Sequence, residues 1–275
     1  MSAKDMFDKI PPLGLLQFVL TPRGNKKDFE EAVEYLKKEY EHNQEMPPLV
    51  KAMKMSRARR ELKEFINTQD IIQHAIDFGM SYENLNSESI DDDWIMYFFN
   101  NARNVCGDDA KIIWGKILAE ESQNNGSIPK QLVHILSVMS KDDAELFNMA
   151  CRFIVERIIY SGYKKMLLID FNDSTGLVEK FSMNSSSIFN LESLGLVKVS
   201  SRGTCIGAKG EQNILGLRYH GIELNIQTQT DQISTGNVVL TRAGELLADL
   251  IEVEPIDGFI EYLKRKYEGE HCIFM

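Results

Sequence analysis

Four apolar stripes of helical period between residues 89 and 160 constrain the fold of this chain most strongly. Their apolar side chains recur at spacings of three and four residues, which is the repeat of one face of an α-helix. The stripes are centred near Phe98, Trp114, Val133 and Phe147, and the last one continues to Ile158. Acidic residues or serine precede each stripe, as is typical of helix starts. The sequence therefore predicts four short-linked helices in a compact antiparallel bundle over residues 89–162.

The preceding residues, 1–88, predict a helical region with an extended start. Residues 13–20 fit a short strand or an irregular docked segment, and residues 28–40 fit an amphipathic surface helix. After the Pro47-Pro48 pair, residues 51–65 fit a second helix, and residues 71–78 fit a buried third one that ends at Gly79.

The pattern changes after Gly162, and residues 163–275 predict a mixed module. Alternating or β-branched runs between glycine and polar turns indicate strands at 165–171, 196–200, 213–219, 222–227 and 237–240. Helical patterns occupy 182–194, 241–250 and 256–267. The expected fold class is α+β and predominantly α: an N-terminal helical region, a four-helix bundle and a C-terminal α+β module.

Charge and composition exclude several classes of protein. The chain has 31 basic and 41 acidic residues and a net charge of −10, which disfavours non-specific coating of nucleic acid. The four cysteines and five histidines are scattered, so neither a metal site nor a disulfide framework is indicated. No signal peptide or membrane span is evident, and we expect a soluble cytoplasmic protein without a cofactor.

One stretch is locally basic, and two interpretations of it stay open. Residues 51–65 carry six cations against two acids. The surface could contact an acidic partner, nucleic acid or a membrane surface, or it could be a solvated helix face whose cations pair with acids of the same chain. The cations are Lys51, Lys54, Arg57, Arg59, Arg60 and Lys63, and residues 51–63 are the predicted contact for any polyanion.

Acidic pairs occur in four places, and three of them lie at predicted helix starts, where capping and the helix dipole explain them. The exception is Glu120-Glu121, which falls late in a helix. Because Glu121 shares a face with Trp114 and Leu118, it is the best single candidate for a functional or buried-partner role. No motif for a nucleophile, phosphate loop or zinc helix occurs, so no catalytic residue is assigned.

Two sequence motifs in the C-terminal module resemble those of winged-helix proteins. Leu191-x-x-Leu-Gly-Leu196 would end a recognition helix, and Leu240-Thr-x-x-Gly-x-x-Leu247 would lead from the wing into the next helix. A DNA-binding copy normally carries Arg or Lys on its recognition helix. The helix at 185–194 has serines, asparagine and Glu192 instead, so use of this shape for protein contact is favoured over DNA binding.

Residues 91–154 carry the motifs Asp93-Trp-x-x-x-Phe-Phe99 and Trp114-x-Lys-Ile-Leu-Ala-x-Glu121. These motifs resemble those of an uncharacterised bacterial family, a domain of unknown function that occurs in prophage, mobile-element and defence gene neighbourhoods. The resemblance covers about residues 65–255, although residues 125–127 are Asn-Gly-Ser where the family has Pro-Gly-Ser. It implies no activity. Its most recognisable positions, which we interpret as structural, are Trp94, Phe98, Trp114, Lys116 and Glu121.

These patterns together predict a non-enzymatic interaction protein in the cytoplasm, and the family resemblance implies a bacterial protein that works in anti-phage defence or mobile-element biology. Its partner would be another protein or a second copy of the chain, and nucleic acid is possible through residues 51–63. The alternative is a winged-helix DNA-binding regulator. A metal-dependent nuclease that uses the acidic pairs is a weaker alternative.

Overall fold

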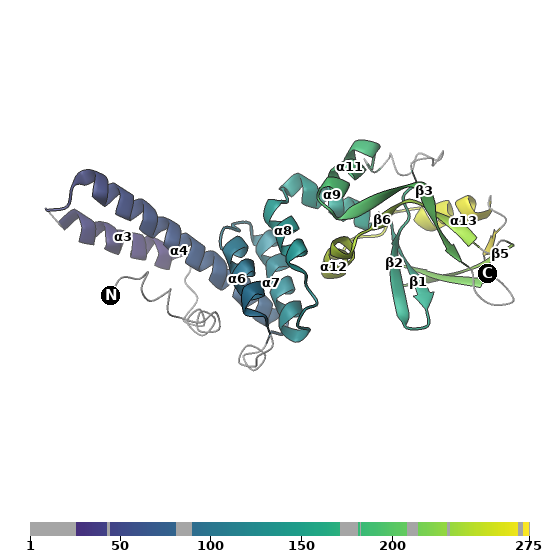
Figure 1. Ribbon diagram of the computed structural model, residues 1–275, viewed down its shortest axis with the longest axis horizontal. Helices are drawn as coiled ribbons and strands as arrows, with labels where there is room; N and C mark the ends of the chain where they lie inside the picture. Colours follow the sequence, from purple (N-terminus) through teal and green to yellow (C-terminus); the bar gives the residue numbers. More distant parts are fainter. Residues whose placement is uncertain are drawn as a thin grey trace. The chain divides into compact units, whose positions relative to one another are not determined.

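A computed structural model describes residues 26–42, 45–80, 90–170, 181, 183–207, 214–229, 232–268 and 272–274 of the chain. The chain divides into two compact units, Met1–Ser137 and Val138–Met275 (Figure 1). The first unit is helical in its described part, and the second contains every described strand. No helix in these ranges is long and apolar enough to cross a membrane. The segment at 13–20 lies outside the described residues.

The first unit begins with a hairpin of two antiparallel helices, α3 (Lys26–His42) and α4 (Pro48–Asp77). Pro48 opens α4, a position where proline is well tolerated because its missing N–H has no partner there anyway. The sequence predicts two helices within α4, but the structure has one continuous helix. No glycine or proline interrupts it, and the polar residues near its middle are used for packing. Asn67, for instance, is buried and donates to the carbonyl of Arg103 (3.0 Å).

Three further helices follow in this unit, α6 (Asp92–Ala102), α7 (Asp108–Gln123) and α8 (Lys130–Val138). The C-terminal half of α4 packs closely on α7 at Gly115, where an added Cβ would overlap the Cβ of His74 and lie 3.0 Å from the amide nitrogen of Ala75. Beside this contact, Lys111 of α7 forms a largely buried ion pair with Asp70 of α4 (2.7 Å). The close approach at Gly115 and the ion pair between Lys111 and Asp70 therefore hold α4 and α7 together.

The second unit starts with α9 (Lys141–Cys151), and here one prediction is wrong. The helix predicted to continue to Ile158 ends at Cys151, and residues 154–159 form strand β1 (Ile154–Ile159), which pairs antiparallel with β2 (Gly162–Leu167). The residues Ile154, Val155, Ile158 and Ile159 fit either period, but β-branched side chains favour a strand. Residues 154–159 form a strand and not a helix because they pair with β2 along the whole length of the hairpin.

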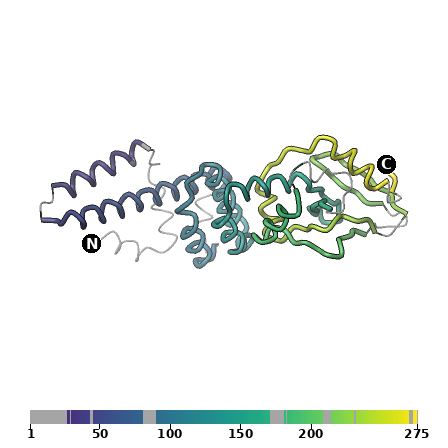
Figure 2. The backbone as a smooth tube through the Cα atoms, turned by 90° about the horizontal axis from the view of Figure 1, so that it is seen from above, coloured from purple at the N-terminus to yellow at the C-terminus, as the bar shows by residue number. Residues whose placement is uncertain are grey.

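Together with β1 and β2, the other described strands form a five-stranded antiparallel sheet and a separate two-stranded ribbon. The sheet has the order β2-β1-β4-β5-β7, where the last three strands are β4 (Ile214–Tyr219), β5 (Ile222–Thr228) and β7 (Cys272–Phe274). The ribbon pairs β3 (Val197–Gly207) with β6 (Gln232–Leu240), and residues 200–203 of β3 form an irregularity in its register. After the β1–β2 hairpin, the described residues also form the helices α11 (Ser185–Ser193), α12 (Arg242–Leu250) and α13 (Phe259–Glu268) (Figure 2).

An aromatic cluster occupies the core of this unit. Phe259 of α13 lies 5.8 Å from Phe153 and 4.7 Å from Tyr219, between ring centroids. All three residues are almost fully buried. The α13 helix is thereby fixed to the sheet, although its own sequence is strongly charged.

The α+β class is confirmed, with antiparallel sheets and a large helical content. Helices α11, α12 and α13 and strands β4 and β5 lie within a few residues of their predicted positions. The unit boundary falls between α8 and α9, so the grouping of α6 to α9 as one four-helix bundle stays a prediction.

Candidate functional site

The predicted basic segment lies on the first half of α4, and we call its six cations the α4 cationic surface. Some of them are engaged within the hairpin. Arg57 pairs with Glu61 (2.6 Å), and this hydrogen bond raises the pKa of the Arg57 guanidinium. Arg60 lies 3.6 Å from Glu64, and Lys54 lies over the ring of Tyr40. Part of the surface therefore pairs within its own chain, as a solvated helix face would.

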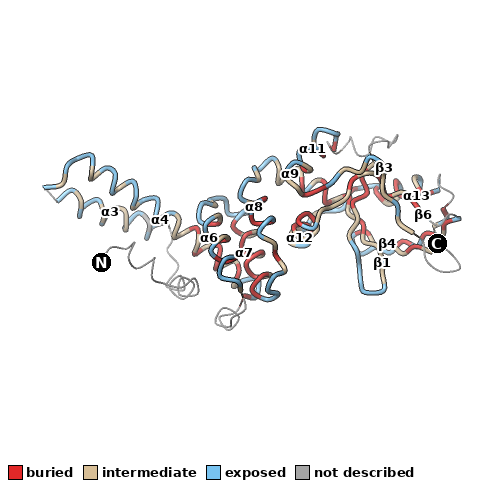
Figure 3. The backbone as a smooth tube through the Cα atoms, viewed as in Figure 1, coloured by how far each residue is buried: buried red, intermediate tan, exposed pale blue. Residues whose placement is uncertain are grey.

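The rest of this surface has no such compensation. Arg59 and Lys63 are exposed and have no ion-pair partner among the described residues. Two large apolar side chains on the same helix also face solvent, since Leu49 is 81% exposed and Met53 is 64% exposed. Figure 3 shows the first half of α4 in the colours of exposed and intermediate residues only. Exposed apolar side chains and unpaired cations on one helix are each typical of contact surfaces.

The aromatic positions of the family motif belong to the core of the helical unit. Trp94 stacks on Phe98 at 5.1 Å between centroids, and Phe98 lies 5.2 Å from Trp114. The three rings are nearly inaccessible to solvent. Lys116, on the outer side, lies over the ring of Phe78 at 5.2 Å. These side chains thus hold α6, α7 and the end of α4 together.

Glu121 holds the loop between α7 and α8. Its side chain is 1% exposed, and its two carboxylate oxygens accept hydrogen bonds from the backbone amides of Gly126 and Ile128, both at 2.8 Å. The indole nitrogen of Trp94 donates to the carbonyl of Ile128 (2.7 Å). Two motif residues therefore fix one loop from opposite sides, which accounts for a carboxylate so late in a helix.

Two of the other acidic pairs cap helices, and the third, Asp108-Asp109, lies in the first turn of α7 without capping it. Asp91 accepts from the amide of Trp94 at the start of α6 (2.8 Å), and Ser140 and Asp143 form a reciprocal capping box at the start of α9. Within the described parts of the chain, no three or more histidine, cysteine or acidic side chains are grouped so that they could hold a metal ion.

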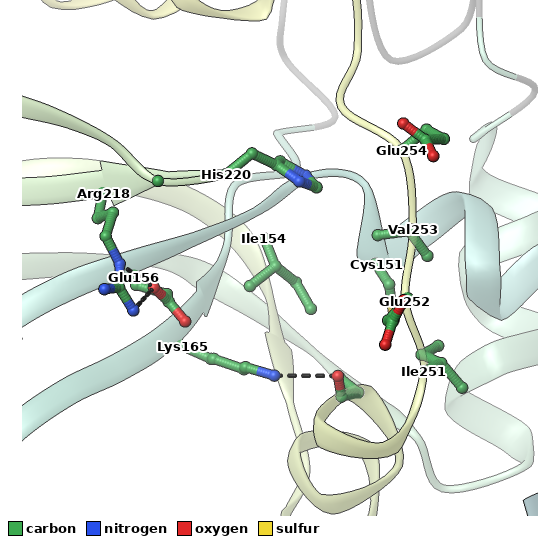
Figure 4. A pocket seen from close by; sticks show the side chains of 12 residues that line it. Cys151, Ile154, Glu156, Lys165, Arg218, His220, Ile251, Glu252, Val253 and Glu254 are labelled. Atoms are coloured by element: carbon green, nitrogen blue, oxygen red, sulfur yellow. Dashed lines mark hydrogen bonds and ion pairs between the residues drawn. The ribbon is translucent and has the colours of Figure 1, made fainter.

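The second unit contains a pocket of about 530 Å³ that the sequence does not predict. Figure 4 shows its lining, which comes from the end of α9, strands β1, β2 and β4, and the segment after α12. The alternation of Ile154 and Glu156 would have indicated a shared face, but only once residues 154–159 are known to form a strand.

A row of charged residues crosses the sheet beside this pocket. Glu156 of β1 is the register partner of both Lys165 of β2 and Arg218 of β4. Arg218 donates to Glu156 (2.6 Å) and lies over the ring of Tyr163. Lys165 donates to the carbonyl of Ala248 (2.9 Å), and it also pairs with Asp249 of α12. Both cations are therefore neutralised within the unit.

Three further titratable groups in and next to the pocket favour uncharged forms or form hydrogen bonds to the backbone. Burial raises the pKa of the Cys151 thiol to about 12, so this sulfur stays protonated and is a poor nucleophile. Burial also lowers the pKa of His220, which favours the neutral imidazole. The Tyr219 hydroxyl donates to the carbonyl of Arg152 and accepts from the amide of Ile256. The Tyr219 hydroxyl thus joins the residue after α9 to the segment after α12.

The two C-terminal motifs singled out in the sequence lie against each other. The Thr241 hydroxyl donates to the carbonyl of Gly195 (2.6 Å) and accepts from the amide of Gly244 (3.1 Å). Gly244 must be glycine here, because an added Cβ would overlap the carbonyl oxygen of Leu196. The junction from α11 into β3 is thus clamped to the junction from β6 into α12.

These features define a protein of a helical unit and an antiparallel α+β unit, with an exposed cationic surface on α4. Residues 53–264 match the family model described as "Protein of unknown function (DUF2806)", and the chain belongs to this family. The match includes most of α4, all of α6 to α12 and the aromatic and Glu121 motifs. No curated protein and no solved structure matches the chain.

Proposed function

We propose that this chain is a non-enzymatic interaction protein that contacts an acidic partner through the α4 cationic surface. The observation that carries the proposal is the combination of two uncompensated cations, Arg59 and Lys63, with the exposed Leu49 and Met53 on one helix. The bacterial, cytoplasmic setting in prophage, mobile-element or anti-phage biology that the motif resemblance implies is part of this proposal.

The chemistry-bearing groups elsewhere in the chain support a binding role. Glu121 is used to fix a loop, Asp91 and Asp143 cap helices, and the Cys151 thiol stays protonated. Groups engaged in this way stabilise structure, whereas Arg59 and Lys63 make no comparable contact. Desolvating an unpaired cation against an opposite charge can add affinity, specificity and a faster association rate.

The experiment compares two clusters of cations on the purified full-length chain. One variant carries Arg59→Gln and Lys63→Gln, and the matched control carries Lys198→Gln and Arg202→Gln on exposed positions of β3. Binding to polyglutamate and to duplex DNA is measured from roughly 50 to 200 mM salt, the range over which electrostatic binding changes most.

We expect polyglutamate binding to weaken about tenfold in the α4 variant and to stay within about twofold in the β3 variant, because exposed pairs contribute up to about 1 kcal/mol each. Binding of polyglutamate that is unchanged by the α4 substitutions would contradict the proposal. So would the lack of binding at the lowest salt by a chain that is monomeric under the same conditions.

The second candidate function is a winged-helix DNA-binding regulator. The clamp between the α11–β3 and β6–α12 junctions favours it, since these are the motifs that resemble those of winged-helix proteins. The outer side of α11 offers Ser185, Ser186 and Phe189 and no cation. The cations near it, Lys198, Arg202 and Arg242, belong to the ribbon and to α12. Duplex binding lost in the β3 variant and kept in the α4 variant would favour this function.

A further inference from the structure

The described side chains of α3 and of the first half of α4 form no buried core. Where side chains are described, no residue of α3 and none between Pro48 and Ile66 of α4 is buried. Burial begins at Asn67, where α4 meets α7, as the change of colour along α4 in Figure 3 shows. Helices in proteins derive most of their stability from packing an apolar face. Two helices with only half-buried contacts therefore need a further layer.

The register of the hairpin follows from contacts near its tip. Lys51 donates to the carbonyl of Glu41 (3.3 Å), and Lys54 lies over Tyr40. Because the helices run antiparallel, residues whose numbers add to about 93 lie at the same level. Lys63 therefore lies level with Glu30, and Arg59 lies level with Glu34.

These four residues lie on two stripes along one edge of the hairpin. Positions 52, 56, 59 and 63 of α4 and positions 30, 34, 37 and 41 of α3 both have spacings of four, three and four, which keep one face of a helix together. Each stripe is turned about a quarter of a circle from the contact between α3 and α4, toward the same side. Every member of both stripes is exposed, and Ala52 and Ser56 are small enough for a close helix approach.

The α4 stripe carries two cations, and the α3 stripe carries three acids and the cation Lys37, which lies level with Ser56. Neither Arg59 and Lys63 nor Glu30 and Glu34 form an ion pair within the described chain. A second copy rotated by half a turn about the hairpin's long direction places α4 of each copy against α3 of the other, antiparallel and in the same register. Each Lys63 then faces a Glu30, and each Arg59 faces a Glu34.

We infer that a second copy of this chain covers this edge, and that the two hairpins form an antiparallel four-helix bundle. The arrangement is closed and uses each surface once per copy, as a twofold dimer requires. It converts the half-buried Val33, Tyr40, Met55 and Leu62 into a shared core. The inference rests on the proposed function, since it names the acidic partner as the α3 edge of another copy. Leu49 and Met53 lie outside this contact.

The test exchanges the charges of the two stripes in the full-length chain. The acidic variant carries Arg59→Glu and Lys63→Glu, and the basic variant carries Glu30→Lys and Glu34→Lys. Sedimentation velocity over a concentration series gives the mass of each protein alone and of their equimolar mixture. Lys141→Glu, an exposed change in the second unit, is the control.

We expect the natural chain and the control to be dimers, and each charge variant alone to dimerise at least about tenfold more weakly. In the mixture both contacts again join opposite charges, so a heterodimer should form within about threefold of the natural affinity. This rescue also shows that both variants fold.

A natural chain that stays monomeric, or a mixture that stays monomeric, would overturn the inference. So would charge variants that dimerise normally when alone. If the natural chain is monomeric while its binding to polyglutamate still depends on Arg59 and Lys63, the second copy is excluded and the proposed function stands. If neither association occurs, both fail.

Discussion

At the scale of single residues, the carboxylate of Glu121 shows why a charged group can be buried in this family's motif. It takes the place of solvent for the backbone amide of Ile128, which is buried, and it also accepts from the amide of Gly126 in the exposed part of the same loop. Buried polar groups that lose their partner cost about 1–3 kcal/mol each.

We therefore expect Glu121→Ala to lower the free energy of unfolding by about 2–4 kcal/mol, measured by urea denaturation. Glu120→Ala is the matched control, because Glu120 only accepts from the side chain of Asn124 near the surface. Its cost should stay below about 1 kcal/mol. Equal effects of the two substitutions would show that the loop does not depend on the buried carboxylate.

The sequence singles out Glu121 by its position late in a helix and on an apolar face. It does not reveal the hydrogen bonds, because these depend on how residues 124–128 turn back over α7. The role of Gly115 is hidden for the same reason. Its need for a small side chain comes from His74, about forty residues earlier in the chain, and not from the helix in which it lies.

At the scale of secondary-structure elements, the helix starts are the best-predicted features. The caps at Asp91, Ser140 and Thr241 are local, since each side chain bonds to an amide three residues ahead. The end of α9 is not local. Residues 152–159 fit a helical stripe as well as a strand, and pairing with β2 decides the outcome. Strand β7 was missed because three residues at the tail give no period.

The α9 cap gives a prediction with a definite dependence on pH. Asp143 accepts from the hydroxyl and amide of Ser140 and from the amide group of Asn190 in α11. These hydrogen bonds, those from Ser140 first, lower the pKa of the Asp143 carboxyl below its ordinary value. The unfolded chain therefore binds the proton more readily, and the stabilisation is present above about pH 4 and lost as the pH falls below it.

We expect Asp143→Asn to cost about 0.5–1 kcal/mol at neutral pH and progressively less as the pH falls below about 4, by urea denaturation at a series of pH values. Asp142→Asn is the control, since it makes the same chemical change at the neighbouring exposed position. A penalty for Asp143→Asn that persists at low pH would mean that its charge is not the stabilising feature.

At the scale of the whole molecule, stability is unevenly distributed along α4. Its C-terminal half packs on α7 with buried residues, whereas its first half has exposed cations and half-buried contacts to α3. The basic character of residues 51–63 is visible in the sequence. Three other features can be seen only in the structure. Some of the α4 cations have ion-pair partners and others do not, and none of the described hairpin side chains before Asn67 is buried. Glu30 and Glu34 lie level with Lys63 and Arg59 along the hairpin.

Amide hydrogen exchange along α4, measured over a range of protein concentrations, tests most directly whether this hairpin is an association surface. Regions with few buried contacts open most easily, so partner binding should slow their exchange. We expect amides of residues 48–66 to exchange at least about tenfold more slowly at high than at low concentration, and residues 67–77 to stay protected throughout. Residues 48–66 that exchange as slowly as residues 67–77 at every concentration would contradict the role proposed for the α4 cationic surface.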